Sequence, residues 1–153
     1  MTVAAHRGLS PVRTVLDNGA VVLAKQSRTT PAVTIHAAFG AGTVFDPPHL
    51  SGLAHFVSRT IDRGTATRPA ETIADELDRR GVSLATSVNR HVLSLVCTCL
   101  VDDLEPILQI LADIVMHPVF PANEITTRRA EIITLIRQDD DNPAVVAMEG
   151  FLA

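Results

Sequence analysis

The side chains best suited to chemistry lie on one predicted helix, over residues 51–63. On a 3.6-residue period His55, Ser58 and Arg59 share its polar face, opposite an apolar stripe. A histidine can bind a metal ion or transfer a proton, but a metal site needs further donors. Asp62 lies seven residues after His55, which is about 10 Å along a helix and too far for one ion. From spacing alone, this face builds no metal site.

The elements around this helix alternate between β-like runs and amphipathic helices. Asn18-Gly19 predicts a tight hairpin turn, because this pair accepts positive φ angles. Strands are predicted over 20–25, 33–39 and within 82–100, where residues 89–90 are either a bend or a polar point in one long strand. Helices are predicted over 51–63 with Ser51 as the cap, after Pro69, and over 104–116, 122–138 and 144–153. This mixture predicts a two-layer α/β sandwich, with a mixed or antiparallel sheet packed against helices.

Composition narrows the class of protein. The chain has 153 residues, of which 46% are hydrophobic and 20% charged, as in a globular domain. A net charge of −4 without a basic run, and the lack of Trp and Tyr, argue against a nucleic-acid partner. No stretch approaches the roughly 20 apolar residues of a membrane span. We expect neither nucleic acid nor membrane as a partner.

Two further features concern the cell compartment and the cysteines. The N-terminus lacks the apolar region of a secretory signal, so a cytoplasmic location is expected. Arg7 and Arg13 precede the first acidic residue, Asp17, which leaves organellar targeting open. Cys97 and Cys99 share one face of a β-like run and are predicted to be small buried side chains.

A series of short motifs runs along nearly the whole chain in a fixed order. They are Leu16-Asp17-Asn18-Gly19, Gly52-Leu53-Ala54-His55-Phe56, Arg63-Gly64-Thr65, Gly81 with Ser83 and Ala85, His117-Pro118 with Phe120, and Arg129 to Asp141 with Pro143. In combination they resemble the pitrilysin/insulinase-type zinc peptidases (inverzincins), which include mitochondrial processing peptidase. The resemblance implies the metallopeptidase fold and a zinc site.

The active site implied by this resemblance uses an inverted H-x-x-E-H helix, in which two histidines bind zinc and the glutamate activates a metal-bound water. Matched to this chain, the first histidine is His55, the base position is Ser58 and the second histidine position is Arg59. The third ligand, a glutamate of a later helix, falls on Leu135, and a supporting glutamate falls on Arg128. The base and two of three ligands are therefore replaced. We expect no zinc cofactor, although active relatives use zinc, and no peptidase activity.

The replaced positions could instead form a different site. His55, Arg59 and Arg128 would make an anion pocket for a carboxylate if they converged where the metal is bound in relatives. The alternative is ion pairing along each helix. The expected local pairs are Arg59 with Asp62, and Arg128 with Glu124 or Glu131.

One strand could bind peptide. Leu84, Ala85, Thr86 and Ser87 resemble the family strand that accepts an extended substrate by β-augmentation. An ordinary sheet strand is the alternative interpretation.

The resemblance also bears on assembly and function. Relatives are built from about four similar α/β units around a chamber, and in several an inactive half or subunit completes it. We therefore predict that residues 1–153 are a single N-terminal unit, truncated at its C-terminal end, which is non-catalytic and pairs with a catalytic homologue carrying an intact H-x-x-E-H. A stand-alone peptide-binding module at the sheet edge near Ala85 is the alternative, and a residual metalloendopeptidase is the third.

Overall fold

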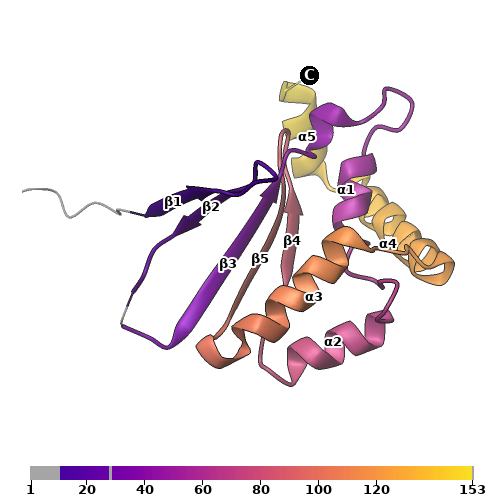
Figure 1. Cartoon of the computed structure of the whole chain (residues 1–153). Coiled ribbons are helices and arrows are strands. Elements are labelled where there is room, and N and C mark those ends of the chain that lie inside the picture. The colour runs from indigo at the N-terminus through magenta and orange to yellow at the C-terminus, as the bar shows by residue number, and fades with distance from the viewer. Residues whose placement is uncertain (1–10, 28, 153) are drawn as a thin grey trace, which may run out of the picture. The chain divides into compact units, whose positions relative to one another are not determined.

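The computed structural model describes residues 11–27 and 29–152, which Figure 1 shows as a ribbon. The chain forms two compact units, Met1–Pro31 and Ala32–Ala153. The prediction of one unit truncated at its C-terminal end stays a prediction. Residues 1–10, which include most of the basic N-terminal stretch, lie outside the described part of the chain.

The first unit contains the predicted hairpin. Strands β1 (Val12–Val15) and β2 (Val21–Ala24) pair antiparallel. Gly19 has a φ of +83°, and the Ala20 N–H donates to Asn18 Oδ1 at 3.0 Å. The turn therefore uses the conformational freedom of glycine together with the short polar side chain of asparagine.

The second unit is built on a three-stranded antiparallel sheet. Its strands are β3 (Ala32–Phe39), β4 (Ala85–Val88) and β5 (Leu93–Leu100), in the spatial order β3-β5-β4. The bend alternative at residues 89–90 is confirmed, because the Asn89 side-chain oxygen accepts the N–H groups of both His91 and Val92 at 2.9 Å and closes a hairpin. Both β3 and β4 are edge strands of this sheet.

Five α-helices complete the second unit, and they match the predicted order. They are α1 (Leu53–Ser58), α2 (Ala70–Asp78), α3 (Leu104–Met116), α4 (Ala122–Asp140) and α5 (Pro143–Leu152). Two short 3₁₀ turns, η1 (Thr43–Phe45) and η2 (Val101–Asp103), precede α1 and α3. In the described part of the chain, no helix is both long and apolar enough to cross a membrane.

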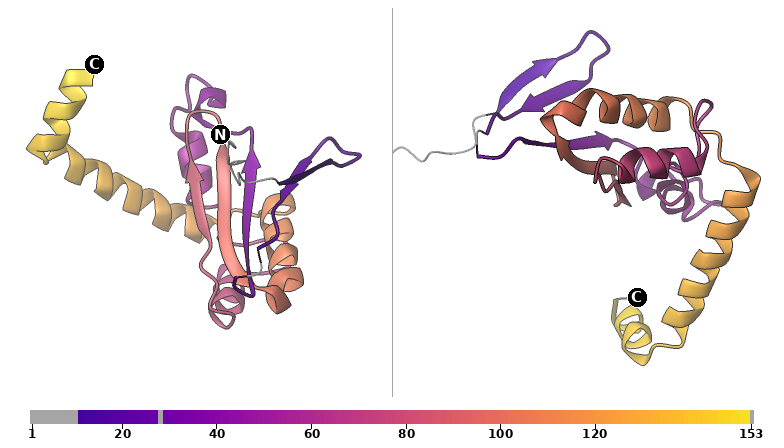
Figure 2. Two further views of the ribbon diagram at one scale, coloured as in Figure 1. Left: turned by 90° about the vertical axis from the view of Figure 1, so that its left-hand side faces the viewer. Right: turned by 90° about the horizontal axis from the view of Figure 1, so that it is seen from below.

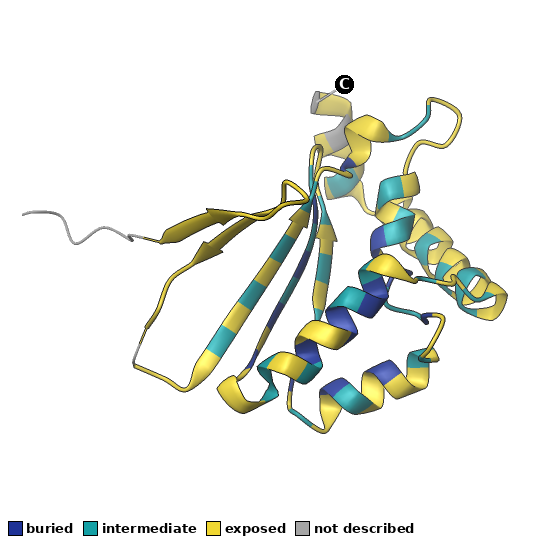
Figure 3. Cartoon of the chain, in the orientation of Figure 1, coloured by how far each residue is buried: buried dark blue, intermediate teal, exposed yellow. Residues whose placement is uncertain are grey.

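The core lies between one face of the sheet and the helices, so the predicted two-layer sandwich is confirmed (Figure 3). Alternate residues of β5 from Leu93 to Cys99 are buried, whereas Thr98 on the other face is exposed. Helix α3 is the main partner layer, and Ile107 and Ile114 have no exposed surface. Cys97 and Cys99 are free and buried as predicted, and burial raises the pKa of both thiols.

The start of α1 differs from the prediction. Ser51 was expected to cap the helix, but the N-cap residue is Gly52, with a φ of +91°. The cap oxygens come from Asp46, whose carboxylate accepts the N–H groups of Gly52 and Ala54 at 2.9 Å each. The left-handed backbone at Gly52 lets the preceding loop fold back, so a side chain six residues before the N-cap accepts hydrogen bonds from the first amides of the helix.

Helix α4 has a different environment from α1, α2 and α3. Figure 2 shows it leading away from the sheet, with α5 packed beside its far end. None of its residues is fully buried, and Ile133, Leu135 and Ile136 are all exposed by more than a third. This helix therefore presents apolar side chains to solvent.

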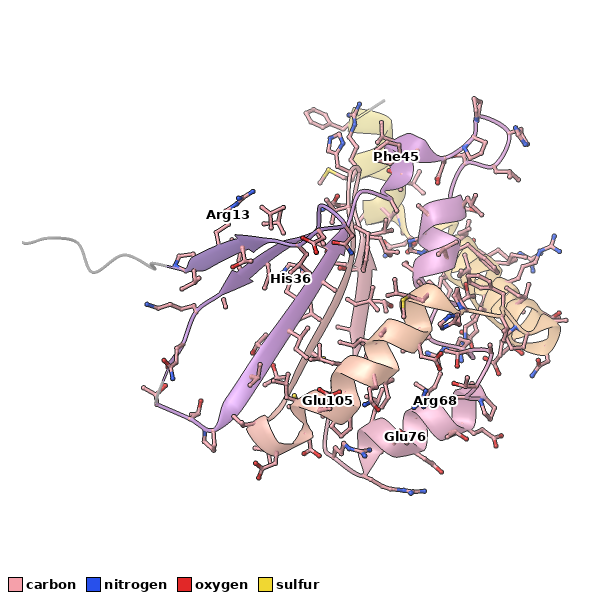
Figure 4. All side chains as sticks on the ribbon, in the orientation of Figure 1. Arg13, His36, Phe45, Arg68, Glu76 and Glu105 are labelled. Carbon is pink, nitrogen blue, oxygen red and sulfur yellow. The ribbon has the colours of Figure 1, made fainter. Side chains whose placement is uncertain are left out.

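One buried carboxylate holds the loop between α1 and α2 against α3. Asp113 of α3 accepts the hydroxyls of Thr65 and Thr67 at 2.5 and 2.6 Å and Arg68 Nη1 at 2.9 Å, and its second oxygen lies 3.3 Å from His117 Nδ1. The two threonine hydroxyls, with smaller contributions from Arg68 and His117, hold the pKa of Asp113 well below its ordinary range. Arg68, labelled in Figure 4 with Glu76, also pairs with that glutamate at 3.4 Å. The negative charge of Asp113 is thus matched by donors from two segments.

Truncation of the core of α3 should lower stability strongly. Ile107→Ala removes a side chain with 0% exposure and should lower the free energy of unfolding by about 2–5 kcal/mol in a denaturant titration. Leu108→Ala on the same helix is the matched control, because Leu108 is 42% exposed and should cost no more than about 1 kcal/mol. Equal losses in the two variants would contradict the assignment of the α3 face.

The pH dependence of stability should reveal Asp113. The pKa of Asp113 is lower in the folded chain than in the unfolded chain, where an Asp carboxyl has a pKa of about 4. The stabilisation is therefore complete above about pH 4 and is lost as the pH falls further. Asp113→Asn should be less stable at neutral pH and should lose less stability on acidification. Asp75→Asn, which alters an exposed ion pair, should keep the wild-type pH profile in the same thermal-melt series.

Candidate functional site

The candidate site begins at the C-terminal end of α1, where Ser58 is only 2% exposed. Its hydroxyl donates to the His55 carbonyl at 2.7 Å, and its own carbonyl accepts the Thr86 hydroxyl of β4 at 2.6 Å. The sequence places Ser58 on one polar face with His55 and Arg59, but the Ser58 side chain is buried, because α1 ends at Ser58 and this end lies against β4. His55 and Arg59 are exposed as predicted.

The side chains at the family's zinc positions do not fit a zinc ion. His55 offers one nitrogen donor, the Ser58 hydroxyl is engaged with the backbone, and Arg59 carries a fixed positive charge. Leu135 has no donor atom and is 49% exposed on α4. Within residues 11–27 and 29–152, no group of three His, Cys, Asp or Glu side chains is placed to hold a metal ion. The absence of zinc from the protein itself stays a prediction.

The two arginines of the predicted anion pocket have different surroundings. Arg128 pairs with Glu131, one turn along α4, at 2.6 Å, which is one of the local pairs expected from sequence. Asp62 pairs with Arg63 at 3.2 Å instead of with Arg59. The pocket of His55, Arg59 and Arg128 stays a prediction, and the Glu131 carboxylate already neutralises one of its three members.

The predicted peptide-binding residues lie on or next to an edge strand. Ala85, Thr86 and Ser87 belong to β4, and Leu84 comes directly before it and packs against the core. Ala85 and Ser87 are exposed, whereas the Thr86 hydroxyl is bound to α1. On its second side β4 has no partner strand within the described part of the second unit. Peptide binding by this strand stays a prediction.

Two functional features were missed from sequence. Asp113 is one, although a lone acid inside the apolar stretch 106–116, together with Thr65 and Thr67, was a usable signal. The second is a cavity of about 490 Å³ at the start of α1. Its lining residues are His49, Leu50, Ser51, Gly52, Leu53, Phe56 and Arg129. No sequence pattern identifies this cavity, because its walls come from segments more than 70 residues apart.

Curated relatives are similar to this chain over about a third of their own length. A zinc protease of Bacillus subtilis, YmxG, is 25% identical over 131 residues, which is 86% of this chain and 32% of that protein. Subunit 1 of the mitochondrial cytochrome b-c1 complex of Caenorhabditis elegans is 26% identical over 136 residues, or 89% of this chain and 29% of that protein. The chain therefore spans about a third of the relatives that it matches.

Solved structures show the same fold. A peptidase M16 inactive domain from Pseudomonas fluorescens superposes with a TM-score of 0.84 at 22% identity, over 92% of this chain and 34% of that one. A protease from Helicobacter pylori superposes with a TM-score of 0.81 at 17% identity, over 90% of this chain and 33% of that one. The sheet and helices described above are thus the arrangement found in this group of proteins.

The match to a family model covers most of the chain. Residues 21–151 match the model of the insulinase family, peptidase family M16. This range includes the sheet of the second unit, helix α1 and helix α4, and it confirms the resemblance seen in the motifs. The chain belongs to the insulinase family of peptidases.

Proposed function

We propose that this chain is a non-catalytic insulinase-family domain that pairs with a catalytic homologue carrying an intact H-x-x-E-H motif. The observation that carries the proposal is the state of Ser58, at the position of the general base. A hydroxyl has no useful basicity near neutral pH, and this one is buried and donates to the His55 carbonyl. A water molecule at this position would lose no proton to Ser58.

Electrostatics at the neighbouring positions supports the same conclusion. Arg59 stays protonated at any ordinary pH and would repel a zinc ion beside His55. Leu135 cannot coordinate a metal, and a catalytic zinc usually has three protein ligands. With the base and two ligands replaced, peptidase activity by the family mechanism should be lost and not merely reduced.

The exposed apolar side chains of α4 and α5 support a protein partner. Ile136 is 55% exposed and Phe151 is 84% exposed, with Leu135 and Val146 also open to solvent. Large apolar side chains exposed together on two neighbouring helices are typical of protein interaction sites. A homologous domain seated on α4 and α5 would remove this surface from water.

The names of the relatives agree both with a non-catalytic domain and with a peptidase. The Pseudomonas fluorescens structure is described as an inactive domain, and the Caenorhabditis elegans relative is a subunit of a larger complex. The Bacillus subtilis relative is described as a zinc protease, which keeps residual peptidase activity as a third candidate. A cytoplasmic location is part of the proposal, and the free thiols of Cys97 and Cys99 suit a reducing compartment.

A peptide-binding module is the second candidate, and the position of β4 favours it. An edge strand offers unpaired N–H and C=O groups to an extended peptide. Ala85 and Ser87 are exposed, and the Thr86 hydroxyl anchors the strand to α1. This activity would need no catalytic partner.

Co-purification tests the pairing. The chain alone, supplied with zinc, should cleave no peptide; mixed with a catalytic homologue from the same genome, it should co-elute and raise that enzyme's kcat/KM. Ile136→Asp should weaken the complex by about tenfold or more, because it places a charge in the apolar contact. Gln138→Asp, an exposed polar site on the same helix, is the matched control.

His55→Ala separates catalysis in this chain from catalysis in its partner. It should leave the activity of the complex unchanged, whereas replacing the glutamate of the partner's H-x-x-E-H should abolish that activity. Zinc-dependent cleavage by the isolated chain that disappears in His55→Ala would sink the proposal.

Hydrogen exchange distinguishes the second candidate. If an extended peptide adds to β4, amides of Ala85–Val88 that face the open edge should exchange more slowly once peptide is added. Amides of β3, the opposite edge of the same sheet, are the internal control and should not change. Protection that appears only when the catalytic homologue is present would exclude an independent peptide-binding module.

A further inference from the structure

We infer that the cavity between the start of α1 and helix α4 binds the C-terminal residue of a peptide, with a free carboxylate and an apolar side chain. Both helices are labelled in Figure 1. The cavity volume of about 490 Å³ lies in the range of small-ligand pockets. The inference goes beyond pairing with a homologue, because the cavity includes none of the replaced zinc positions and no residue of β4.

The polar part of the cavity comes from two separate segments. His49 lies in the loop before α1, and Arg129 lies on α4. A guanidinium group presents a planar set of donors that matches a carboxylate, and an imidazole supplies a further N–H in either of its neutral tautomers. Within the described part of the chain, neither side chain has an ion pair. Both are therefore open to an added carboxylate.

The acids near these two residues in sequence have other partners: Glu131, two residues after Arg129, pairs with Arg128 at 2.6 Å. Asp46 precedes His49 by three residues, but its two oxygens accept the N–H groups of Gly52 and Ala54. Asp46 also does not line the cavity. The carboxylate of Asp46 is therefore engaged in capping α1.

The apolar part of the cavity selects the kind of anion. Leu50, Leu53 and Phe56 line the same space as the two polar side chains, and Leu53 and Phe56 are one turn apart on α1. A C-terminal leucine or phenylalanine carries its carboxylate and its apolar side chain on one Cα atom. An internal Asp or Glu has no apolar group at that position, and a simple anion such as phosphate has none at all. The lining therefore favours an apolar C-terminal residue.

A peptide titration followed by NMR tests the inference. The probe is an acetylated pentapeptide of glycine and serine that ends in leucine with a free carboxylate, and the comparison is the same peptide with a C-terminal amide. Saturable shifts are expected at the amides of Leu50, Leu53 and Arg129. The amide should bind about tenfold more weakly, because it loses a charge-assisted pair. Equal affinity for the two peptides, shifts centred elsewhere, or no saturable binding would overturn the inference.

Two variants and one control assign the affinity to the cavity. Arg129→Gln should weaken binding of the free acid about tenfold and make acid and amide bind alike. His49→Gln, in a loop and independent of α4, should weaken it in the same direction. Arg137→Gln on the same helix is outside the cavity and should bind as the wild type does. Wild-type affinity in both Arg129→Gln and His49→Gln would contradict the assignment even if the peptide binds.

Discussion

The carboxylate of Asp113 joins two segments on which the second unit depends. It accepts hydrogen bonds from Thr65, Thr67 and Arg68, in the loop that leads from α1 to α2, and it sits on α3, the helix that covers the core face of the sheet. A buried charge is costly unless donors surround it, and here the donors come from that loop and from His117, the residue that follows α3. These hydrogen bonds hold the loop that follows α1 against α3, and the replaced zinc-site positions His55, Ser58 and Arg59 lie in or next to α1.

At the C-terminal end of α1, the polar atoms of Ser58 form hydrogen bonds within the protein. The Ser58 hydroxyl and carbonyl are both hydrogen-bonded, the first within α1 and the second to Thr86. Arg128, on the helix that supplies the third zinc ligand in relatives, is held by Glu131. The groups that replace a base and a supporting acid therefore have local partners. The proposed non-catalytic role follows from these contacts.

Local patterns predicted most of the fold. The run 104–116 has the bounds of α3, because its apolar period is strong and His117-Pro118 ends it, and Asn18-Gly19 forms the hairpin turn. Non-local contacts account for the errors. Ser58 is buried by a strand 28 residues later, and Asp46 replaces Ser51 as the cap because a loop folds back. The replaced zinc positions could be found only through the family motifs, since His55 alone has no partner at metal-binding spacing.

We predict that His55 belongs to no metal site. Isothermal titration of zinc into chelator-treated chain tests this most directly, with His55→Ala measured in parallel. We expect no stoichiometric binding that depends on His55, and identical titrations for the two proteins. One zinc bound per wild-type chain, and lost in His55→Ala, would contradict it.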